Sequence, residues 1–197
     1  MIRKVTGRSV KTLLRRRILS PLGLRHTHIS SLPRIPQPVL HAYTSDRGPY
    51  EDSTYWSPSW TIAGDMIMTG TIADAVKSAK AIGTGALISR RAARERVAPI
   101  TARFPGFSRR VYYGLGILVA NGWQLQNPEL QGYTAISAYL PSRRIALALT
   151  TTKGIAAAAT DTNYSELLFS ELTQYLTPGH AVLIPGNPGI ERQPQPK

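Results

Sequence analysis

Apolar and small residues alternate along one long part of the chain, between residues 111 and 152. Residues 111–119 are aromatic and apolar, residues 133–140 alternate tyrosine and aliphatic residues with small ones, and residues 144–152 alternate large aliphatic residues with alanine and threonine. A period of two is typical of strands with one buried face. The pattern predicts a three-stranded antiparallel meander with a tight turn at residues 141–143. The loop over residues 121–131 is where a site would lie.

The N-terminal part of the chain carries a helix signal and then a long irregular stretch. Ser9 is a suitable N-cap for a helix to about residue 19, and Pro21 ends it. Residues 21–58 are rich in proline and serine, which favours turns over regular structure. Three aromatic side chains at the end of this stretch should anchor it to the core: Tyr55, Trp56 and Trp60.

Three further helices are predicted around the strands. Thr71 and Asp74 form a variant of the capping box before a helix over residues 75–82, for which Gly83 is the stop signal. Ser89 begins a short helix to about residue 97.

After the strands, residues 161–176 are typical of an amphipathic helix that packs on the sheet. Its helical spacing assigns the apolar face to Tyr164, Leu167, Leu168, Leu172 and Tyr175. The elements together predict an α+β fold, an antiparallel sheet flanked by helices.

The composition is that of one domain with a core. The chain has 197 residues, of which 42% are hydrophobic. We expect one domain over residues 1–176 and a disordered, proline-rich tail over residues 177–197. No cysteine occurs, which excludes disulfides and thiolate zinc sites. No apolar run is long enough for a membrane span and no secretory signal is evident, and the localisation stays open.

Positive charge is concentrated near the N-terminus. The net charge is +13, and residues 1–45 contain nine Lys or Arg and no acid before Asp46. An organellar presequence, a nucleic-acid-binding face or an anionic-lipid-binding face would each have such a pattern. The prolines spaced over residues 33–38 argue against a presequence. The lack of aromatic residues among the arginines argues against nucleic-acid binding. We therefore expect no nucleic-acid partner and a solvated basic surface.

Five segments follow one another in a recognisable order: VTGRSVKTLLRRRILSPLGLRHT, LHAYT, STYWSPSWTIAGDMIMTGTIADAVKSAKAIGTGALIS, YYGLGI and GYTAISAYLPSRRIALAL. Together they resemble the serine β-lactamase and penicillin-binding-protein-like hydrolases over residues 1 to about 176. The resemblance is closest to the branch with D-alanyl-D-alanine carboxypeptidases and related esterases. It implies an antiparallel sheet flanked by helices, with a helical region that carries the nucleophile.

The chemistry implied by this resemblance is acyl transfer through a serine ester. It needs an S-x-x-K serine, a Y-x-N loop, and a K-T-G or H-x-G triplet on a strand. No serine of this chain is followed by lysine at the third position, and no tyrosine by asparagine at the second. The family has both motifs upstream of its VTG segment, and this chain begins four residues before Val5. We therefore expect a partial fold that lacks the N-terminal part of the family's fold, and no catalytic residue in the chain.

The third motif should fall after Trp123, where the chain has Gln126-Asn127-Pro128. Gln126 carries no charge to steer a substrate carboxylate. Pro128 lacks a backbone donor and has a fixed φ, which puts regular strand geometry and the neighbouring oxyanion donor in doubt. Gln126 and Asn127 either form a polar turn or contact a substrate. Together with Trp60, they are the candidate substrate-binding residues.

Other polar residues give weaker signals. His26, His28 and His41 lack an obvious carboxylate and are more typical of surface residues than of metal ligands. Asp65 is interpreted as a loop residue and Asp74 as a helix cap. We expect no metal and no other cofactor.

Two main hypotheses of function follow, and a basic nucleic-acid- or lipid-binding protein is a third, less favoured one. The first is a truncated or degenerate hydrolase of a β-lactam, a D-Ala-D-Ala peptide or an ester, inactive alone. The alternative is a non-catalytic module that binds a peptidoglycan-like or ester ligand, or a partner, around Trp60 and Gln126. Without the rest of the family's fold, a strand edge and part of the C-terminal helix should be open, which predicts marginal stability and self-association.

Overall fold

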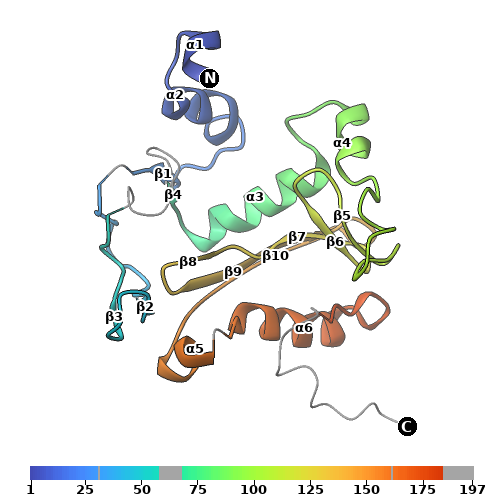
Figure 1. Cartoon of the computed structure of the whole chain (residues 1–197). Helices are drawn as coiled ribbons and strands as arrows, with labels where there is room; N and C mark the ends of the chain where they lie inside the picture. The colour runs from blue at the N-terminus through green and yellow to red at the C-terminus, as the bar shows by residue number, and fades with distance from the viewer. Residues whose placement is uncertain (31, 58–67, 161, 184–197) are drawn as a thin grey trace.

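An antiparallel sheet lies between two long helices in this protein (Figure 1). The computed structural model describes residues 1–30, 32–57, 68–160 and 162–183. Helix α3 (Ile72–Thr84) covers one face of the sheet, and α6 (Tyr164–Leu176) covers the other. The predicted α+β class, an antiparallel sheet flanked by helices, is confirmed.

The sheet has six strands, with β10-β9-β7-β6-β5 side by side and β8 also paired with β9. All pairs are antiparallel. The strands are β5 (Val111–Tyr113), β6 (Leu118–Ala120), β7 (Trp123–Gln126), β8 (Glu129–Leu130), β9 (Tyr133–Leu140) and β10 (Ile145–Thr152). The last two form the predicted hairpin, with Leu140 opposite Ile145 across the turn at residues 141–144.

Two parts of the predicted meander were wrong. Residues 111–119 form two short strands rather than one, and the expected loop over residues 121–131 contains β7 and β8. The link between β6 and β7 is Asn121-Gly122, with φ of 45° and 90°. Asn-Gly with positive φ at both positions is typical of a type I′ hairpin turn, because its twist matches that of the strands. This dipeptide was the signal for the extra hairpin.

The main core lies between the sheet and α6. Trp123 and Phe169 are both fully buried and meet edge to face, with ring centroids 5.3 Å apart. The other buried members of this cluster are Leu118, Ala120, Leu125, Ile136, Ala138, Leu140 and Val182. On β9 these are the even-numbered residues, so the period of two assigns them to the α6 face.

On the opposite face of the sheet, β9 and β10 have mostly small residues. Ala135 and Ser137 on β9 and Ala148 on β10 alternate with the large residues of the α6 face. Gly83 of α3 approaches so closely that an added Cβ would lie 2.2 Å from Cδ1 of Tyr139. Gly83 is therefore a close-packing position inside α3, and the left-handed C-cap is Gly85 with φ 70°, which corrects the predicted stop.

The remaining helices are short. Ser9 and Ser89 accept hydrogen bonds as the predicted N-caps of α2 (Val10–Leu14) and α4 (Arg90–Arg96). A π-helical turn, Arg15–Leu19, continues α2. The others are α1 (Ile2–Thr6), α5 (Ile155–Thr160) and a 3₁₀ turn, Pro178–His180. No helix in the described parts of the chain is long and apolar enough to cross a membrane.

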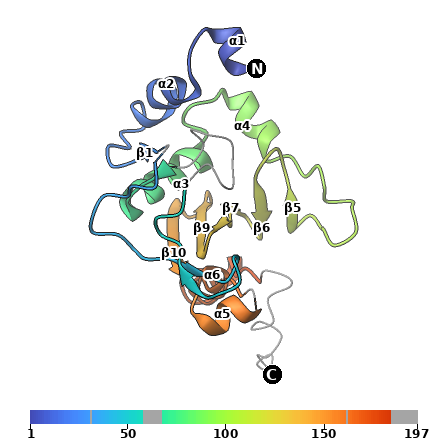
Figure 2. The ribbon, with the colours of Figure 1, turned by 60° about the vertical axis from the view of Figure 1, so that its left-hand side comes forward.

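In its described residues, the proline-rich stretch between α2 and α3 forms two short strand pairs. The first joins β1 (His28–Ile29) to β4 (Met68–Thr69), and the second joins β2 (Tyr43–Thr44) to β3 (Glu51–Asp52). Figure 2 shows that α1, α2 and α4 lie on the same side of the sheet as α3, away from α5 and α6.

The predicted apolar face of α6 was wrong. Tyr164, Leu168 and Tyr175 are exposed, whereas Ser165, Phe169, Ser170 and Thr173 are buried. The sheet contacts a different stripe of the helix, the one with Phe169, because the Phe169 ring packs against Trp123. Ser165 is accepted in the core since its hydroxyl donates to the Thr134 carbonyl at 2.9 Å.

The packed part of the chain extends beyond the predicted boundary at residue 176. Val182 is buried, and its N–H donates to the Thr173 hydroxyl at 2.9 Å. The Trp123 indole N–H donates to the His180 carbonyl at 3.1 Å. Val182 and the His180 carbonyl therefore pack against the sheet and α6, and the domain boundary at residue 176 stays a prediction. The rest of the predicted tail, residues 184–197, lies outside the described residues.

Asp74 fastens the start of α3 to the segment before β1. Its carboxylate accepts from the His26 N–H at 2.8 Å and the Thr27 hydroxyl at 3.0 Å. Burial by itself raises the pKa of Asp74, but these hydrogen bonds and Lys77 outweigh it, so the pKa lies below its usual value. The cap of α3 is the Thr71 hydroxyl, and Asp74 is a tertiary link rather than a cap.

We expect acid to weaken this link. A carboxyl group whose pKa is lower in the folded state stabilises the fold at any pH above its unfolded-state pKa of about 3.9. This stabilisation is lost as the pH falls from that value through the lower, folded-state pKa. Asp74→Asn should cost about 1 kcal/mol at pH 7 and less at pH 3. Urea unfolding at the two pH values measures this, with exposed Asp46→Asn as the control. An equal loss for Asp74→Asn at both pH values would contradict the assignment.

Candidate functional site

The candidate site lies where the ladder along β9 is interrupted. Strand β7 ends at Gln126 and β8 begins at Glu129, and both pair with β9. Between them, the Pro128 carbonyl accepts from the Ala135 N–H at 2.9 Å. Proline has no N–H for the ladder, so the strand divides at this point.

Gln126 lies on the α3 face of the sheet. It pairs with Ser137 of β9, and its side-chain amide donates to the Gly116 carbonyl at 2.6 Å. Gln124, two residues earlier and on the same face, is 3.5 Å from the Arg96 guanidinium. The Gln126 amide therefore braces the turn between β5 and β6.

Asn127 lies on the opposite face. Its side-chain amide donates to Glu166 Oε1 of α6 at 2.6 Å. The structure thus directs Gln126 and Asn127 away from each other, and each amide is held by a partner within the chain. Trp60, the third candidate, lies outside the described residues. The assignment of these three residues to substrate binding stays a prediction.

Polar side chains hold the divided strand from the α6 side. Thr134 and Thr151 share a hydrogen bond of 2.6 Å, and the Ser165 hydroxyl lies 3.0 Å from that of Thr151. Close by in sequence, the mostly buried Lys153 ammonium pairs with Glu129 of β8. Glu166 therefore holds Asn127, and Lys153 holds Glu129, the first residue after residues 127–128.

We expect Asn127→Ala to lower the free energy of unfolding by about 1–3 kcal/mol, because it leaves the Glu166 carboxylate without its amide partner. The measurement is a double-mutant cycle with Glu166→Gln in urea. The double variant should lose little more than either single variant. Gln124→Ala is the matched control on the other face. Fully additive losses would show that the 2.6 Å contact does not stabilise the loop.

A histidine–carboxylate pair was missed from the sequence. His41 Nδ1 lies 2.7 Å from Asp52 Oδ2, so the expectation that His41 has no carboxylate was wrong. The hairpin of β2 and β3 brings the two residues together across eleven positions. A hydrogen bond from the Thr54 hydroxyl lowers the pKa of Asp52, and its bonds with Thr54 N–H and His41 act in the same direction.

This pair has the histidine and the carboxylate of a serine triad but not the serine. A carboxylate on Nδ1 orients an imidazole so that Nε2 can accept a proton. Among the described residues, however, no serine hydroxyl bonds to His41. Its neighbours are Thr54 at 3.4 Å and the Tyr55 ring, edge-on at 6.0 Å.

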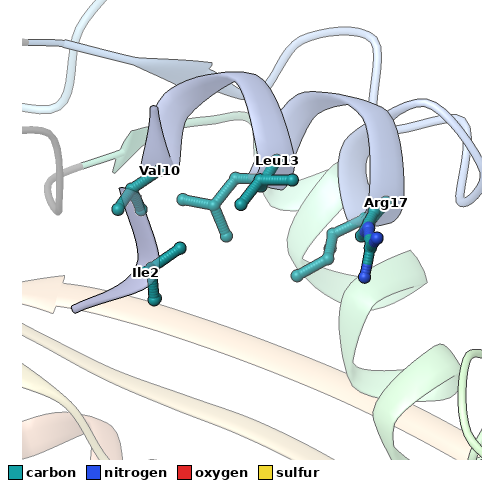
Figure 3. Close-up of a pocket in the computed structure, with 6 residues that line it drawn as sticks. Ile2, Val10, Leu13 and Arg17 are labelled. Atoms are coloured by element: carbon teal, nitrogen blue, oxygen red, sulfur yellow. The ribbon is translucent and has the colours of Figure 1, made fainter. Parts of the chain in front are cut away.

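Figure 3 shows an apolar pocket of about 140 Å³ in the N-terminal helices. Its lining is Ile2, Val10, Leu13, Leu14, Arg17 and Ile18. Apart from the Arg17 guanidinium, no polar side chain is available there to orient a substrate. In the described parts of the chain, no group of three or more histidine, aspartate or glutamate side chains could hold a metal ion.

The beta-lactamase family model matches residues 1–170. This chain belongs to the beta-lactamase family. The expected family, that of the serine β-lactamase and penicillin-binding-protein-like hydrolases, is therefore confirmed. None of the curated protein sequences matches this member significantly.

Solved structures of the same fold include three informative neighbours. The D-stereospecific amidohydrolase from Streptomyces sp. is 25% identical, with a TM-score of 0.63 over 83% of this chain and 50% of its own. The D-amino acid amidase from Ochrobactrum anthropi, in complex with L-phenylalanine amide, is 28% identical, with a TM-score of 0.56 over 76% of this chain and 45% of its own.

A penicillin-binding protein from Bacillus halodurans is 16% identical, with a TM-score of 0.60 over 81% of this chain and 50% of its own, and shows the fold alone. This family member thus spans about half the length of the solved structures that it matches. That share agrees with the expected partial fold.

Proposed function

We propose that this chain forms one wall of a serine acyl-hydrolase site and is inactive by itself. The observation that carries the proposal is that no S-x-x-K and no Y-x-N occurs anywhere in its 197 residues. An acyl-serine reaction requires a nucleophile and a group that takes its proton, and an oxyanion site alone does not replace them. The hydrogen bonds of Gln126 and Asn127 within the chain agree with a wall that supports rather than reacts.

The proposed parent reaction is hydrolysis of an amide, a β-lactam or an ester through an acyl-serine. Two neighbours at 25% and 28% identity, a D-stereospecific amidohydrolase and a D-amino acid amidase, favour the amide of a D-amino acid as the bond. The groups that would cleave it belong to parts of the fold that this chain does not match.

Hydrolysis assays with the pure protein test the proposal. A D-amino acid amide, nitrocefin and p-nitrophenyl acetate should each react no faster than in buffer. Intact mass after incubation with a penicillin should show no acyl adduct. Turnover that a single serine-to-alanine change abolishes would overturn the proposal, because it would identify a nucleophile in this chain.

A second candidate function is non-catalytic binding of a peptidoglycan-like or ester ligand. It is supported by the place of Gln126, half-buried at the end of β7 on the α3 face. Binding should then saturate and weaken in Gln126→Ala and Trp60→Ala, with Gln174→Ala on the other side of the sheet as control. Lack of saturable binding by calorimetry would count against this function.

A further inference from the structure

A second concentration of positive charge, apart from the N-terminus, lies between residues 90 and 110. This segment holds seven arginines and one acid, Glu95, which pairs with Arg91 at 2.8 Å. Arg96 is engaged within the fold, where its guanidinium donates to the Ile82 carbonyl and lies 3.5 Å from Gln124. The other six arginines are exposed: Arg90, Arg91, Arg94, Arg103, Arg109 and Arg110. The segment therefore presents a strongly positive surface to solvent.

Large apolar side chains are exposed beside these arginines. The loop after α4 folds back on β5, because the Thr101 hydroxyl accepts from the Tyr113 N–H at 2.7 Å and the Thr101 N–H donates to the Tyr113 carbonyl at 3.3 Å. Four apolar side chains next to this contact are between 37% and 59% exposed: Ile100, Phe104, Tyr113 and Leu115. An exposed apolar group that is bordered by polar side chains is typical of an interaction surface.

Hydrogen bonds within the segment fix this surface to the sheet. The Leu115 N–H donates to the Arg96 carbonyl at 2.8 Å, and the Tyr112 hydroxyl donates to the Val97 carbonyl at 2.9 Å. Strand β5 is the edge of the sheet opposite to β10, and Figures 1 and 2 show α4 and the loop after it at that edge. We call the six exposed arginines and the four apolar residues the β5 patch.

Charge is distributed unevenly over the molecule. Residues 121–183, which include β7 to β10, α5 and α6, hold three Lys or Arg and four Asp or Glu. Residues 90–110 hold seven basic residues and one acid. Because α4 lies on the side of the sheet away from α5 and α6, a negatively charged surface attracts the molecule by that side (Figure 2).

We propose that the β5 patch docks on the surface of a membrane that contains anionic lipids. The arginines bind the phosphate of the headgroups, and the four apolar side chains enter the boundary between headgroups and acyl chains. The patch lies outside the proposed hydrolase wall around Gln126, so lipid binding does not depend on that function.

The apolar side chains favour lipid over nucleic acid as the partner. Proteins that bind single-stranded nucleic acid without sequence preference use aromatic side chains as stacking platforms among basic residues. Ile100 and Leu115, both at least half exposed, are aliphatic and have no π face to stack on a base. Their entry into the headgroup boundary removes apolar surface from water, which a phosphate backbone cannot do.

Sedimentation with lipid vesicles tests the charge of the patch. The protein should bind vesicles of phosphatidylcholine with phosphatidylglycerol, bind much less to phosphatidylcholine alone, and dissociate as the salt concentration rises. Arg109→Gln together with Arg110→Gln should weaken binding about 25-fold, since each arginine near an anionic surface contributes about five-fold. The matched control is Arg143→Gln with Arg144→Gln, an exposed pair on the turn between β9 and β10. Equal weakening in both pairs would overturn the patch as the docking surface.

A cysteine probe tests whether the apolar side chains enter the membrane, since the chain has no cysteine. Leu115→Cys, labelled with an environment-sensitive dye, should shift its emission to the blue on phosphatidylglycerol vesicles. The control Tyr175→Cys, at an 84% exposed position on α6, should not. Glycerol phosphate in solution should not displace the protein, because a soluble headgroup offers no boundary for apolar side chains. An unshifted Leu115→Cys, or displacement by glycerol phosphate, would indicate simple phosphate binding and overturn membrane docking.

Two further results overturn the proposal, once circular dichroism has confirmed that each variant is folded. The first is wild-type protein that does not bind phosphatidylglycerol vesicles even at low ionic strength. The second is an oligonucleotide that binds more tightly than the vesicles and loses affinity in Arg109→Gln with Arg110→Gln, which would identify nucleic acid as the partner.

Discussion

Trp123→Ala should lower the free energy of unfolding by about 3–5 kcal/mol, the cost of removing a large aromatic side chain from a core. Trp123 is fully buried between the sheet and α6, where it meets Phe169 edge to face. Its indole N–H also donates to the His180 carbonyl at 3.1 Å, so the substitution leaves a part-buried acceptor without its partner. Because small domains have only about 5–15 kcal/mol in total, this loss is a large share of the free energy of unfolding.

Urea unfolding followed by circular dichroism measures this loss. Trp123→Phe should retain part of the stability, since the ring contact stays and the hydrogen bond does not. Tyr175→Ala is the control, because that side chain is 84% exposed and its loss should change the stability by less than about 0.5 kcal/mol. A Trp123→Ala variant as stable as Tyr175→Ala would mean that the core between sheet and α6 does not hold the fold together.

Gly132→Ala should cost about 3 kcal/mol or more, for two separate reasons. Gly132 has a φ of 87°, a backbone conformation that alanine adopts only with strain. An added Cβ would also lie 2.1 Å from the Tyr43 carbonyl oxygen. Since this neighbour is backbone, β2 and the rest of its hairpin must move away from the sheet.

Limited proteolysis detects this movement together with the loss of stability. The variant should be cut faster in the segment over residues 45–50, which connects β2 and β3. Gly154→Ala is the matched control, because nothing lies within 4 Å of an added Cβ there. Unchanged proteolysis and stability in Gly132→Ala would place the hairpin of β2 and β3 away from this part of the sheet.

Several local features could be predicted from the sequence because their cause is local. The N-caps Ser9, Thr71 and Ser89 depend on one hydroxyl and a backbone N–H three residues later. The hairpin of β9 and β10 follows from its period of two and its turn residues. The predicted strand defect at Pro128 depends only on its missing N–H, and the ladder divides there.

The arrangement of the candidate site could not be predicted in this way. Gln126 and Asn127 are neighbours in the sequence, but a strand directs successive side chains to opposite faces. Only the tertiary fold supplies their different partners, the Gly116 carbonyl in the turn between β5 and β6 and Glu166 of α6. His41 and Asp52 meet only because the β2–β3 hairpin forms. The apolar stripe of α6 was misassigned because spacing leaves the rotation of a helix open, and Trp123 decides it.

The sequence by itself determined the family, the fold class and the absence of the S-x-x-K and Y-x-N motifs, since these depend on residue order and periodicity alone. Tertiary structure decided which face each polar side chain occupies and which carboxylate meets His41. Those outcomes depend on contacts between segments far apart in the chain. The spacing of residues within one segment does not determine the energy of such contacts.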